Sequence, residues 1–274
     1  MDGFTSASIF WLYLKELMPD IKIHYYLHEG KQHGLEDLMD KIENEAEDID
    51  LLVVPDAGSN DEEYHRTLRD VGIPILVLDH HEANQYSEDA IVINNQLSKN
   101  YLNKQLTGAG VVYQFCRYLD WLYGKNYADN YLDLVCLGII SDMGKVSEPE
   151  NAYIIKKGLS QIPKNYLFQS FITKQAYSIG DRINAISIAF YVTPLINALI
   201  RVGTMEEKEK LFLAFIDGRR EVPSTKRGEK GLMEDLATQV VRNCTNARVH
   251  QNKELDGFLE EIDFRIQDSH LSTD

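Results

Sequence analysis

The chain has 274 residues, of which 44% are hydrophobic, and its formal net charge is −15 at pH 7. The length suits one large domain or two modest ones. The negative charge disfavours sequence-blind binding of nucleic acid through a broadly basic surface, although clustered carboxylates that hold divalent cations can reverse the sign of the charge locally.

The cellular environment is indicated by the cysteines and by the absence of targeting patterns. Cys116, Cys136 and Cys244 are widely spaced, which argues against a disulfide framework and for free, buried thiols in a cytoplasmic protein. No uninterrupted apolar stretch approaches the length of a membrane span, and no N-terminal segment has the form of a secretory signal. We therefore expect no membrane partner.

The first residues lead directly into an apolar pattern with helical spacing. Thr5 or Ser6 stands where it can cap that helix. An acidic residue and a glycine before a helix usually follow a strand in α/β proteins, but no strand precedes Asp2 and Gly3. The fold therefore begins either with a helix or in the middle of a motif.

Short apolar strands then alternate with polar helices. Strands are predicted at 21–27, 50–55, 75–78 and 90–94, with helices at 36–46 and 62–71. This alternation predicts an α/β fold with a doubly wound, mainly parallel sheet and flanking helices.

The second half of the chain is helical by pattern. Helices are predicted at 107–122, 131–143, 151–159, 183–202 (interrupted by Pro194) and 206–215. Residues 219–231 are polar, basic and punctuated by Gly and Pro, which predicts a loop. One long charged helix follows over 232–266. We therefore expect a main domain over 1–231 and a long connecting helix over 232–274.

The most informative stretch is 73–84, IPILVLDHHEAN, in which an apolar strand ends in Asp79, His80 and His81. Ligands bind beyond the carboxyl ends of the strands in a parallel sheet. Three side chains of ligand type are costly to bury there and are well placed to hold a metal. The alternative interpretation is a plain polar exit from the strand.

Three further carboxylates extend this pattern. Asp56 also follows a strand, Asp2 precedes the first helix, and Asp142 ends an otherwise apolar helix. Together with an imidazole they form an oxygen-rich set that suits Mn²⁺ or Mg²⁺ better than Zn²⁺. A turn, an N-cap and a helix end are the respective alternatives. A carboxylate at a helix C-terminus opposes the helix dipole, which favours a ligand role for Asp142.

These motifs, in this order, resemble those of the DHH phosphoesterases, and within them the RecJ-type single-strand-specific exonucleases. MDGFTS resembles the end of the family's D-x-D-G-x-x-S motif, so Asp2 matches its second aspartate. VVPDAGS, DHH and LGIISDMG match the later motifs. LTGAGVVY resembles the S-G-A-G stretch, EPENAYIIKKGL resembles the segment after the fourth motif, and PLINALIRVG resembles I-N-A-x-x-R-x-G.

The resemblance also implies what lies outside this sequence. The motif's first aspartate and the strand before it would lie upstream of Met1. The family's second domain, with its glycine-rich substrate-binding motif, would lie beyond Asp274. We therefore expect a chain truncated at both ends that keeps the catalytic domain and the connecting helix.

The resemblance implies phosphodiester hydrolysis with Mn²⁺ or Mg²⁺ as cofactor. Asp56 would bridge two metals, and Asp2, His80 and Asp142 would complete one of the two sites. The other site would need ligands from upstream. The remaining implied roles concern support and substrate: Asp79 would orient His80 or otherwise support the metal ligands, His81 would contact the phosphate or a metal-bound water, and Gly108, Gly110, Asn197 and Arg201 would contact the substrate.

The residues around Arg201 add an argument of their own. LINALIRVG is otherwise apolar, and a guanidinium in such surroundings needs an anionic partner. Asn197 lies four residues earlier, on the same helical face. The alternative is that Arg201 only interacts with the end of its helix.

Three functions fit these observations. The first is a RecJ-like exonuclease acting on single-stranded DNA, with DNA repair or replication proteins as partners. The second is a phosphodiesterase for short oligonucleotides or cyclic dinucleotides. The third is a catalytically inactive DHH-like scaffold module. The intact DHH motif and Asp56 favour an enzyme, whereas the missing N-terminal aspartate favours the scaffold.

Overall fold

The computed structural model describes residues 1–29, 34–160, 162–229 and 231–268. Its centre is a three-stranded parallel sheet of β1 (Leu52–Pro55), β2 (Ile75–Asp79) and β3 (Ile91–Asn94), in that order. Since all three strands run in the same direction, their carboxyl ends meet at one edge.

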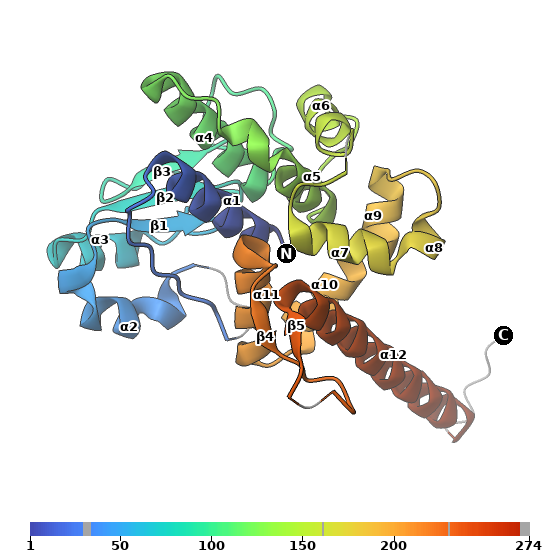
Figure 1. Ribbon diagram of the computed structural model, residues 1–274. Coiled ribbons are helices and arrows are strands. Elements are labelled where there is room, and N and C mark those ends of the chain that lie inside the picture. The colour runs from blue at the N-terminus through green and yellow to red at the C-terminus, as the bar shows by residue number, and fades with distance from the viewer. Residues whose placement is uncertain (30–33, 161, 230, 269–274) are drawn as a thin grey trace.

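Helices cover both faces of this sheet (Figure 1). One face carries α1 (Asp2–Leu17) and α4 (Gly108–Tyr123), and the other carries α2 (Met39–Asn44) and α3 (Glu62–Asp70). Along β2, Leu76 and Leu78 pack in the core with α1 and α4, whereas Ile75 and Val77 pack in the core with α2 and α3. Successive strand residues point to opposite faces of the sheet. Because helices cover both faces, every residue of β2 is buried. The predicted doubly wound sheet is confirmed.

The remaining helices form a second body beside the sheet. They are α5 (Leu132–Ser141), α6 (Pro149–Gly158), α7 (Tyr166–Lys174), α8 (Ala176–Ile179), α9 (Ala185–Tyr191), α10 (Thr193–Val202) and α11 (Met205–Asp217). A short 3₁₀ turn at Ala128–Tyr131 precedes α5, and two others, at Glu36–Leu38 and Ala46–Asp48, flank α2 beside the sheet. Helix α5 lies at the centre, and its residues 133–140 are all buried. This burial explains why its sequence is apolar on every side.

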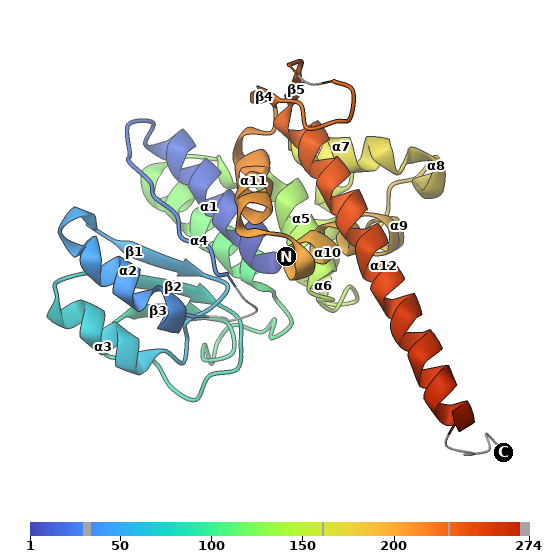
Figure 2. The ribbon, with the colours of Figure 1, turned by 90° about the horizontal axis from the view of Figure 1, so that it is seen from below.

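The long helix α12 (Leu236–Asp268) begins inside this helical body and leaves it. Leu236, Val240 and Cys244 near its start are buried, whereas Leu255 and Phe258 are exposed. Figure 2 shows the second half projecting away from the other helices. The predicted long helix is therefore present, and residues 269–274 of the predicted connecting segment lie outside the described residues. All three cysteines are free and buried, as expected.

Two predictions for the N-terminal region were wrong. Residues 21–27 form no strand, although Tyr25 packs against Trp11 and Phe212 and Tyr26 donates a hydrogen bond to Glu45. The alternating pattern reflects partial burial of side chains, which does not require backbone pairing. Helix α1 starts at Asp2, so Thr5 lies inside the helix and donates to the carbonyl oxygen of Asp2 instead of capping it.

Two predictions for the C-terminal half also need correction. The predicted loop contains β4 (Glu221–Pro223), which pairs antiparallel with β5 (Met233–Asp235) immediately before α12. Helices α7 and α8 were not predicted, because their short apolar pattern lies among polar residues. The predicted helix over 183–202 is two helices that break at Val192.

The stretch Ala185–Val202 has the length and hydropathy that a membrane span requires. Core helices of globular proteins meet the same criterion. Here Val192, Ile196 and Leu199 are buried within the helical core, which accounts for their apolar character.

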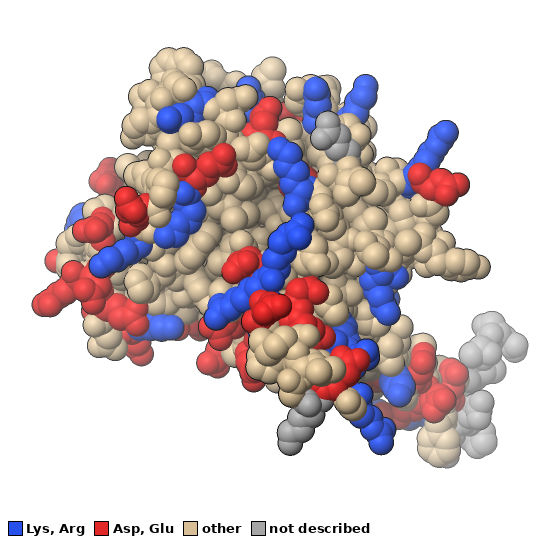
Figure 3. Space-filling view, viewed as in Figure 1, with Lys and Arg blue, Asp and Glu red and all other residues tan. Residues whose placement is uncertain are grey.

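The surface charge is unevenly distributed. In Figure 3 acidic side chains gather at the left and at the lower centre of the face, while Lys and Arg side chains form a line that runs down its middle. The net charge of −15 therefore does not describe every part of the surface.

Candidate metal centre

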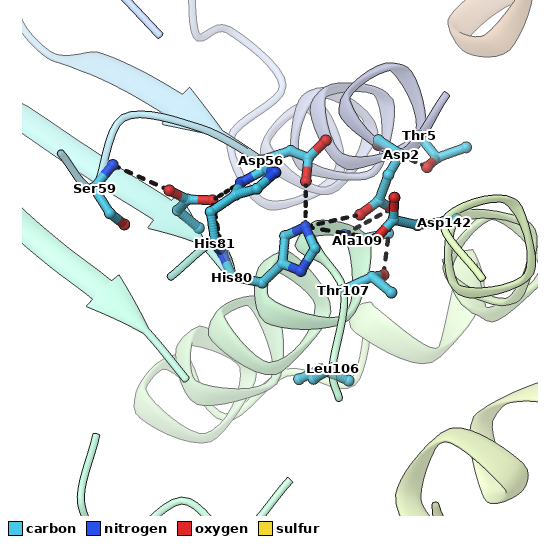
Figure 4. A network of polar contacts seen from close by, with 12 residues as sticks. Asp2, Thr5, Asp56, Ser59, His80, His81, Leu106, Thr107, Ala109 and Asp142 are labelled. Carbon is cyan, nitrogen blue, oxygen red and sulfur yellow. Dashed lines mark hydrogen bonds and ion pairs between the residues drawn. The ribbon is translucent and has the colours of Figure 1, made fainter. Parts of the chain in front are cut away.

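The carboxyl edge of the sheet brings together residues that are far apart in the sequence (Figure 4). Asp56 directly follows β1, and His80 directly follows β2. Asp2 is the first residue of α1, and Asp142 is the C-cap of α5. Two strand ends, one helix start and one helix end thus converge, so the structure places the four predicted metal ligands side by side.

One imidazole nitrogen faces three carboxylates. His80 Nε2 lies 3.1 Å from Asp56 Oδ1, 3.7 Å from Asp142 Oδ2 and 3.9 Å from Asp2 Oδ2. Two overlapping sets, Asp2–His80–Asp142 and Asp56–His80–His81, each have their ligand atoms within 4.8 Å of one another. This spacing suits a divalent cation bound between oxygen and nitrogen ligands.

The backbone conformation of Asp56 helps to aim its carboxylate. Asp56 has a φ of 64°, in the left-handed region that residues other than glycine rarely adopt. Its N–H still donates to the carbonyl oxygen of Leu78 over 2.8 Å, as though β1 continued for one more residue. Strained conformations of this kind cluster at functional sites because the surrounding structure must enforce them.

Glycines make room for these carboxylates. A Cβ atom at Gly108 would lie only 2.2 Å from Asp56 Oδ1, and one at Gly138 would lie 2.6 Å from Asp2 Oδ1. A Cβ atom at Gly110 would instead meet the side chain of Leu106 at 2.3 Å. Gly108 and Gly110 are both buried. These close approaches give both glycines a packing role, and their predicted contact with substrate stays a prediction.

The start of α4 also holds Asp2. The backbone N–H of Ala109 and the hydroxyl of Thr107 both donate to Asp2 Oδ1, over 3.2 and 3.3 Å. A carboxylate is stabilised at this position by the positive end of the helix dipole. The two hydrogen bonds occupy one oxygen of Asp2 and leave Oδ2 facing His80.

Asp79 is buried and forms hydrogen bonds with both histidines of the DHH motif. Its carboxylate accepts hydrogen bonds from the backbone N–H groups of Ser59 (3.0 Å), His80 (2.7 Å) and His81 (3.2 Å), and it contacts His81 Nδ1 at 2.7 Å. Although burial opposes ionisation, the hydrogen bonds from His81 and Ser59 hold the pKa of Asp79 well below its usual value. The side-chain contact of Asp79 is with the His81 ring, so the prediction that it orients the His80 ring was wrong. The alternative prediction was that Asp79 supports the metal ligands in another way. The hydrogen bond from the His80 backbone N–H to Asp79 agrees with that alternative.

The cluster contains more carboxylates than cationic groups, because three carboxylates surround one imidazole. Burial and the charge of Asp56 raise the pKa of Asp2 to about 7, and burial and the charge of Asp2 raise the pKa of Asp142. Burial lowers the pKa of His80, but contact with Asp56 and the charges of Asp2 and Asp142 outweigh it and raise this pKa to about 9. The raised pKa values of the carboxylates and of the imidazole both mean that the site binds protons readily. A bound cation would displace these protons.

Two buried carboxylate oxygens without hydrogen bonds from the described residues indicate whether the site fits a metal. Asp2 Oδ2 and Asp56 Oδ1 are buried and accept no hydrogen bond within the described part of the chain. A buried acceptor without a partner costs about 1–3 kcal/mol, and more when it is charged. Both oxygens face His80 Nε2, so a hard divalent cation at this point would satisfy them.

The predicted substrate residues Asn197 and Arg201 both lie on α10. Arg201 is exposed, and its guanidinium makes no hydrogen bond or ion pair with any described residue. The apolar surroundings inferred for it were wrong, because neighbouring residues of a helix point to different sides. Burial is the main cause of the lowered pKa of the Met1 amino group, and the charge of Arg201 makes a smaller contribution in the same direction. Asn197 is half-buried on the same helix.

Sequence reasoning missed one group of contacts. Asn94, at the end of β3, and Gln96 hydrogen-bond the backbone of His81 and His80. A sequence signal for these contacts was available, because Asn94 is a polar residue at the end of a third parallel strand. The ends of parallel strands meet at the same edge, so Asn94 could have been expected to lie near the DHH motif.

A family model described as the DHH family, N-terminal domain, matches residues 1–139. This chain belongs to the DHH family. The predicted resemblance is therefore confirmed, and it rests on more than the three-letter motif, because the matched region contains Asp2 and Asp56 as well.

Curated relatives support the RecJ-type resemblance. The putative SPbeta prophage-derived single-strand DNA-specific exonuclease YorK of Bacillus subtilis is 40% identical over 273 residues, which cover 99% of this chain and 46% of the relative. The single-stranded-DNA-specific exonuclease RecJ of Thermus thermophilus is 28% identical over 212 residues, covering 77% of this chain and 31% of RecJ. The chain thus spans less than half the length of these relatives.

Solved structures show the same fold. A crystal structure of exonuclease RecJ bound to manganese superposes with a TM-score of 0.76 at 23% identity, covering 95% of this chain and 62% of that chain. RecJ from Thermus thermophilus in complex with Mn²⁺ gives a TM-score of 0.73 at 23% identity, covering 95% of this chain and 35% of that chain. At this identity the likeness establishes the α/β architecture of the DHH domain.

Proposed function

We propose that this DHH chain catalyses metal-dependent hydrolysis of phosphodiester bonds as an exonuclease on single-stranded DNA. The observation that carries the proposal is the convergence of Asp2, Asp56 and Asp142 on His80 Nε2, with two buried oxygens that have no other partner among the described residues. The choice of single-stranded DNA is supported by the activity for which the relatives YorK and RecJ are named.

Asp2, Asp56, His80 and Asp142 would hold the metal. Their oxygen-rich composition favours Mn²⁺ or Mg²⁺, and RecJ structures have been solved with manganese and magnesium. When bound, such a cation polarises phosphoryl oxygens and lowers the pKa of a coordinated water. Asp56 contributes to one ligand set and lies beside the other, which is compatible with a bridging role.

His81 would act on the phosphate directly. Its side chain is 48% exposed, and its Nδ1 contacts Asp79. The hydrogen bond to Asp79 raises the pKa of His81, although burial opposes this. Asp79 therefore fixes the ring orientation and favours a protonated ring, which can donate a hydrogen bond to a phosphate oxygen.

Arg201 and Asn197 would bind the substrate. The exposed guanidinium has no carboxylate partner among the described residues, so it is available for a bidentate contact with a phosphate. Asn197 lies one helical turn earlier, where it can hydrogen-bond a nucleotide. We further propose that the protein acts in the cytoplasm with DNA repair or replication proteins, and the three free buried thiols agree with that location.

The test is a Mn²⁺-dependent hydrolysis assay on 5′-labelled single strands, with duplex DNA and cyclic and linear dinucleotides as competing substrates. The matched control is Asp56→Asn, which keeps the side-chain size and tolerates the left-handed backbone but removes the charge. We expect single-strand degradation that Asp56→Asn abolishes. If only dinucleotides are cleaved, the protein is a dinucleotide phosphodiesterase and not an exonuclease on single-stranded DNA. If nothing is cleaved but single strands are still bound, the protein is a scaffold.

A further inference from the structure

Strand β3 carries none of the proposed metal ligands, yet its end contacts the DHH motif. Asn94 is the last residue of β3 and pairs in register with Asp79 of β2. It is only 3% exposed. A buried amide must satisfy its donors and its acceptor, so the partners of Asn94 describe what this strand end holds in place.

All the partners of the Asn94 side chain lie around the motif. Its Nδ2 donates to the carbonyl oxygen of His81 over 2.9 Å and to Ser59 Oγ over 2.8 Å. Its Oδ1 accepts the backbone N–H of Gln96 over 2.7 Å. Ser59 in turn donates its own N–H to Asp79. Asn94 thus joins the loop after β1 to the motif after β2.

Gln96 makes the corresponding contact with the other histidine. Its Nε2 donates to the carbonyl oxygen of His80 over 3.2 Å and to that of Lys104 over 2.8 Å. Lys104 Nζ donates to the carbonyl oxygens of Asn95, Gln96 and Ser98, which fixes the loop that carries Gln96. The two consecutive histidine carbonyls are therefore each held by one amide side chain.

We propose that Asn94 and Gln96 are positioning residues for the DHH motif and set the affinity of the cluster for divalent cations. They hold the backbone of His81 and His80 from one side, while Asp79 accepts the N–H groups of the same two residues from the other. Because the carbonyl and N–H groups of both histidines are hydrogen-bonded, the backbone of the turn is restrained, which helps to keep His80 Nε2 directed at the three carboxylates. Among the described residues, neither amide side chain hydrogen-bonds the side chain of a proposed metal ligand, so their effect is exerted through the backbone.

This inference rests on the proposed metal centre but not on nuclease activity. Groups that orient metal ligands typically account for 10–100-fold in metal affinity. We expect Asn94→Ala to weaken Mn²⁺ binding by about 10–100-fold, measured by calorimetry on the full chain. We expect Gln96→Met, which keeps the length of the side chain but removes its donor, to weaken it in the same direction.

Asn165→Ala is the control for loss of an asparagine whose side chain hydrogen-bonds the backbone at a distance from the metal centre; Asn165 itself is half-buried. Asn165 also donates to a carbonyl, that of Phe215, and accepts a backbone N–H, that of Phe168, but it lies at the start of α7. We expect it to lower the melting temperature in the absence of metal and to leave the Mn²⁺ affinity unchanged.

Three outcomes decide the question. Weakened Mn²⁺ binding in Asn94→Ala and Gln96→Met, with unchanged binding in Asn165→Ala, supports the inference even if the enzyme proves to act on another substrate. Unchanged affinity in a folded Asn94→Ala or in Gln96→Met overturns it. Equal loss of affinity in all three variants, in proportion to melting temperature, also overturns it, because the effect would then be general destabilisation. If Asn94→Ala does not fold, Gln96→Met decides alone.

Discussion

Alanine variants of Gly108 and Gly110 distinguish the effect of close packing beside the metal centre from the effect of close packing elsewhere in the protein. Both glycines lie in the first turn of α4, and both are buried. A Cβ atom at Gly108 would lie 2.2 Å from Asp56 Oδ1 and 2.7 Å from Asp56 Cγ, whereas one at Gly110 would lie 2.3 Å from Leu106 Cδ1. The two alanine variants therefore create equally close contacts with different neighbours.

The magnitudes follow from these distances. Ordinary contact requires about 3.5 Å, so the Asp56 carboxylate must move by more than about 1 Å to accommodate the methyl group that Gly108→Ala adds. Overpacking costs about 1–3 kcal/mol, offset by up to about 1 kcal/mol because alanine favours the helix. Both variants should therefore lose about 0–3 kcal/mol of unfolding free energy. Only Gly108→Ala displaces a proposed ligand, which should weaken Mn²⁺ binding about 10–100-fold.

The assay is calorimetric titration with Mn²⁺, combined with thermal unfolding of the metal-free protein and the Michaelis constant for single-stranded DNA. We expect weaker Mn²⁺ binding for Gly108→Ala and unchanged binding for Gly110→Ala. Equal Mn²⁺ affinities in the two variants would refute the reasoning from packing. A raised Michaelis constant in both variants, with wild-type Mn²⁺ affinity, would instead support the predicted contact of these glycines with substrate.

Three further predictions concern charge. Because a metal-binding imidazole must be neutral and the pKa of His80 is raised to about 9, Mn²⁺ binding at about pH 7.5 should release about one proton, with a smaller contribution from Asp2. Calorimetry in buffers of different ionisation enthalpy measures this, and buffer-independent heats would contradict it. Asp79→Asn should lower the unfolding free energy by about 1.5–3 kcal/mol at neutral pH, because it weakens charge-assisted hydrogen bonds. Since the pKa of Asp79 is depressed on folding, this stability is present above its ordinary value of 3.8 and is lost as the pH falls below it, so denaturant titrations of the two proteins should converge in acid. A constant difference at all pH values would exclude that origin. Arg201→Lys should preserve the melting temperature and Mn²⁺ affinity but weaken single-strand binding by about 1.5–3 kcal/mol, because lysine cannot copy a bidentate contact. Unaltered kinetics with a lowered melting temperature would make Arg201 structural.

The sequence by itself determined the fold class and the four proposed ligands. Short apolar runs that end in polar residues are local features, and parallel strands place such ends at one edge whatever the rest of the chain does. Asp56 and His80 were found in this way, and Asp142 was found as a carboxylate that ends an apolar helix. Their order along the chain carried the family resemblance, which the match over residues 1–139 confirmed.

Only the tertiary structure decided how those ligands are held. The sequence around residues 21–27 has the alternation of a strand, but whether a backbone pairs depends on which segment lies beside it. The partner of Asp79 could not be read from the DHH string, because both histidines adjoin it and only the turn decides which ring it contacts. Likewise Asn94 reaches His81 from the neighbouring strand, and Gly108 meets Asp56 from a separate helix. Such contacts join distant segments, so no local pattern encodes them.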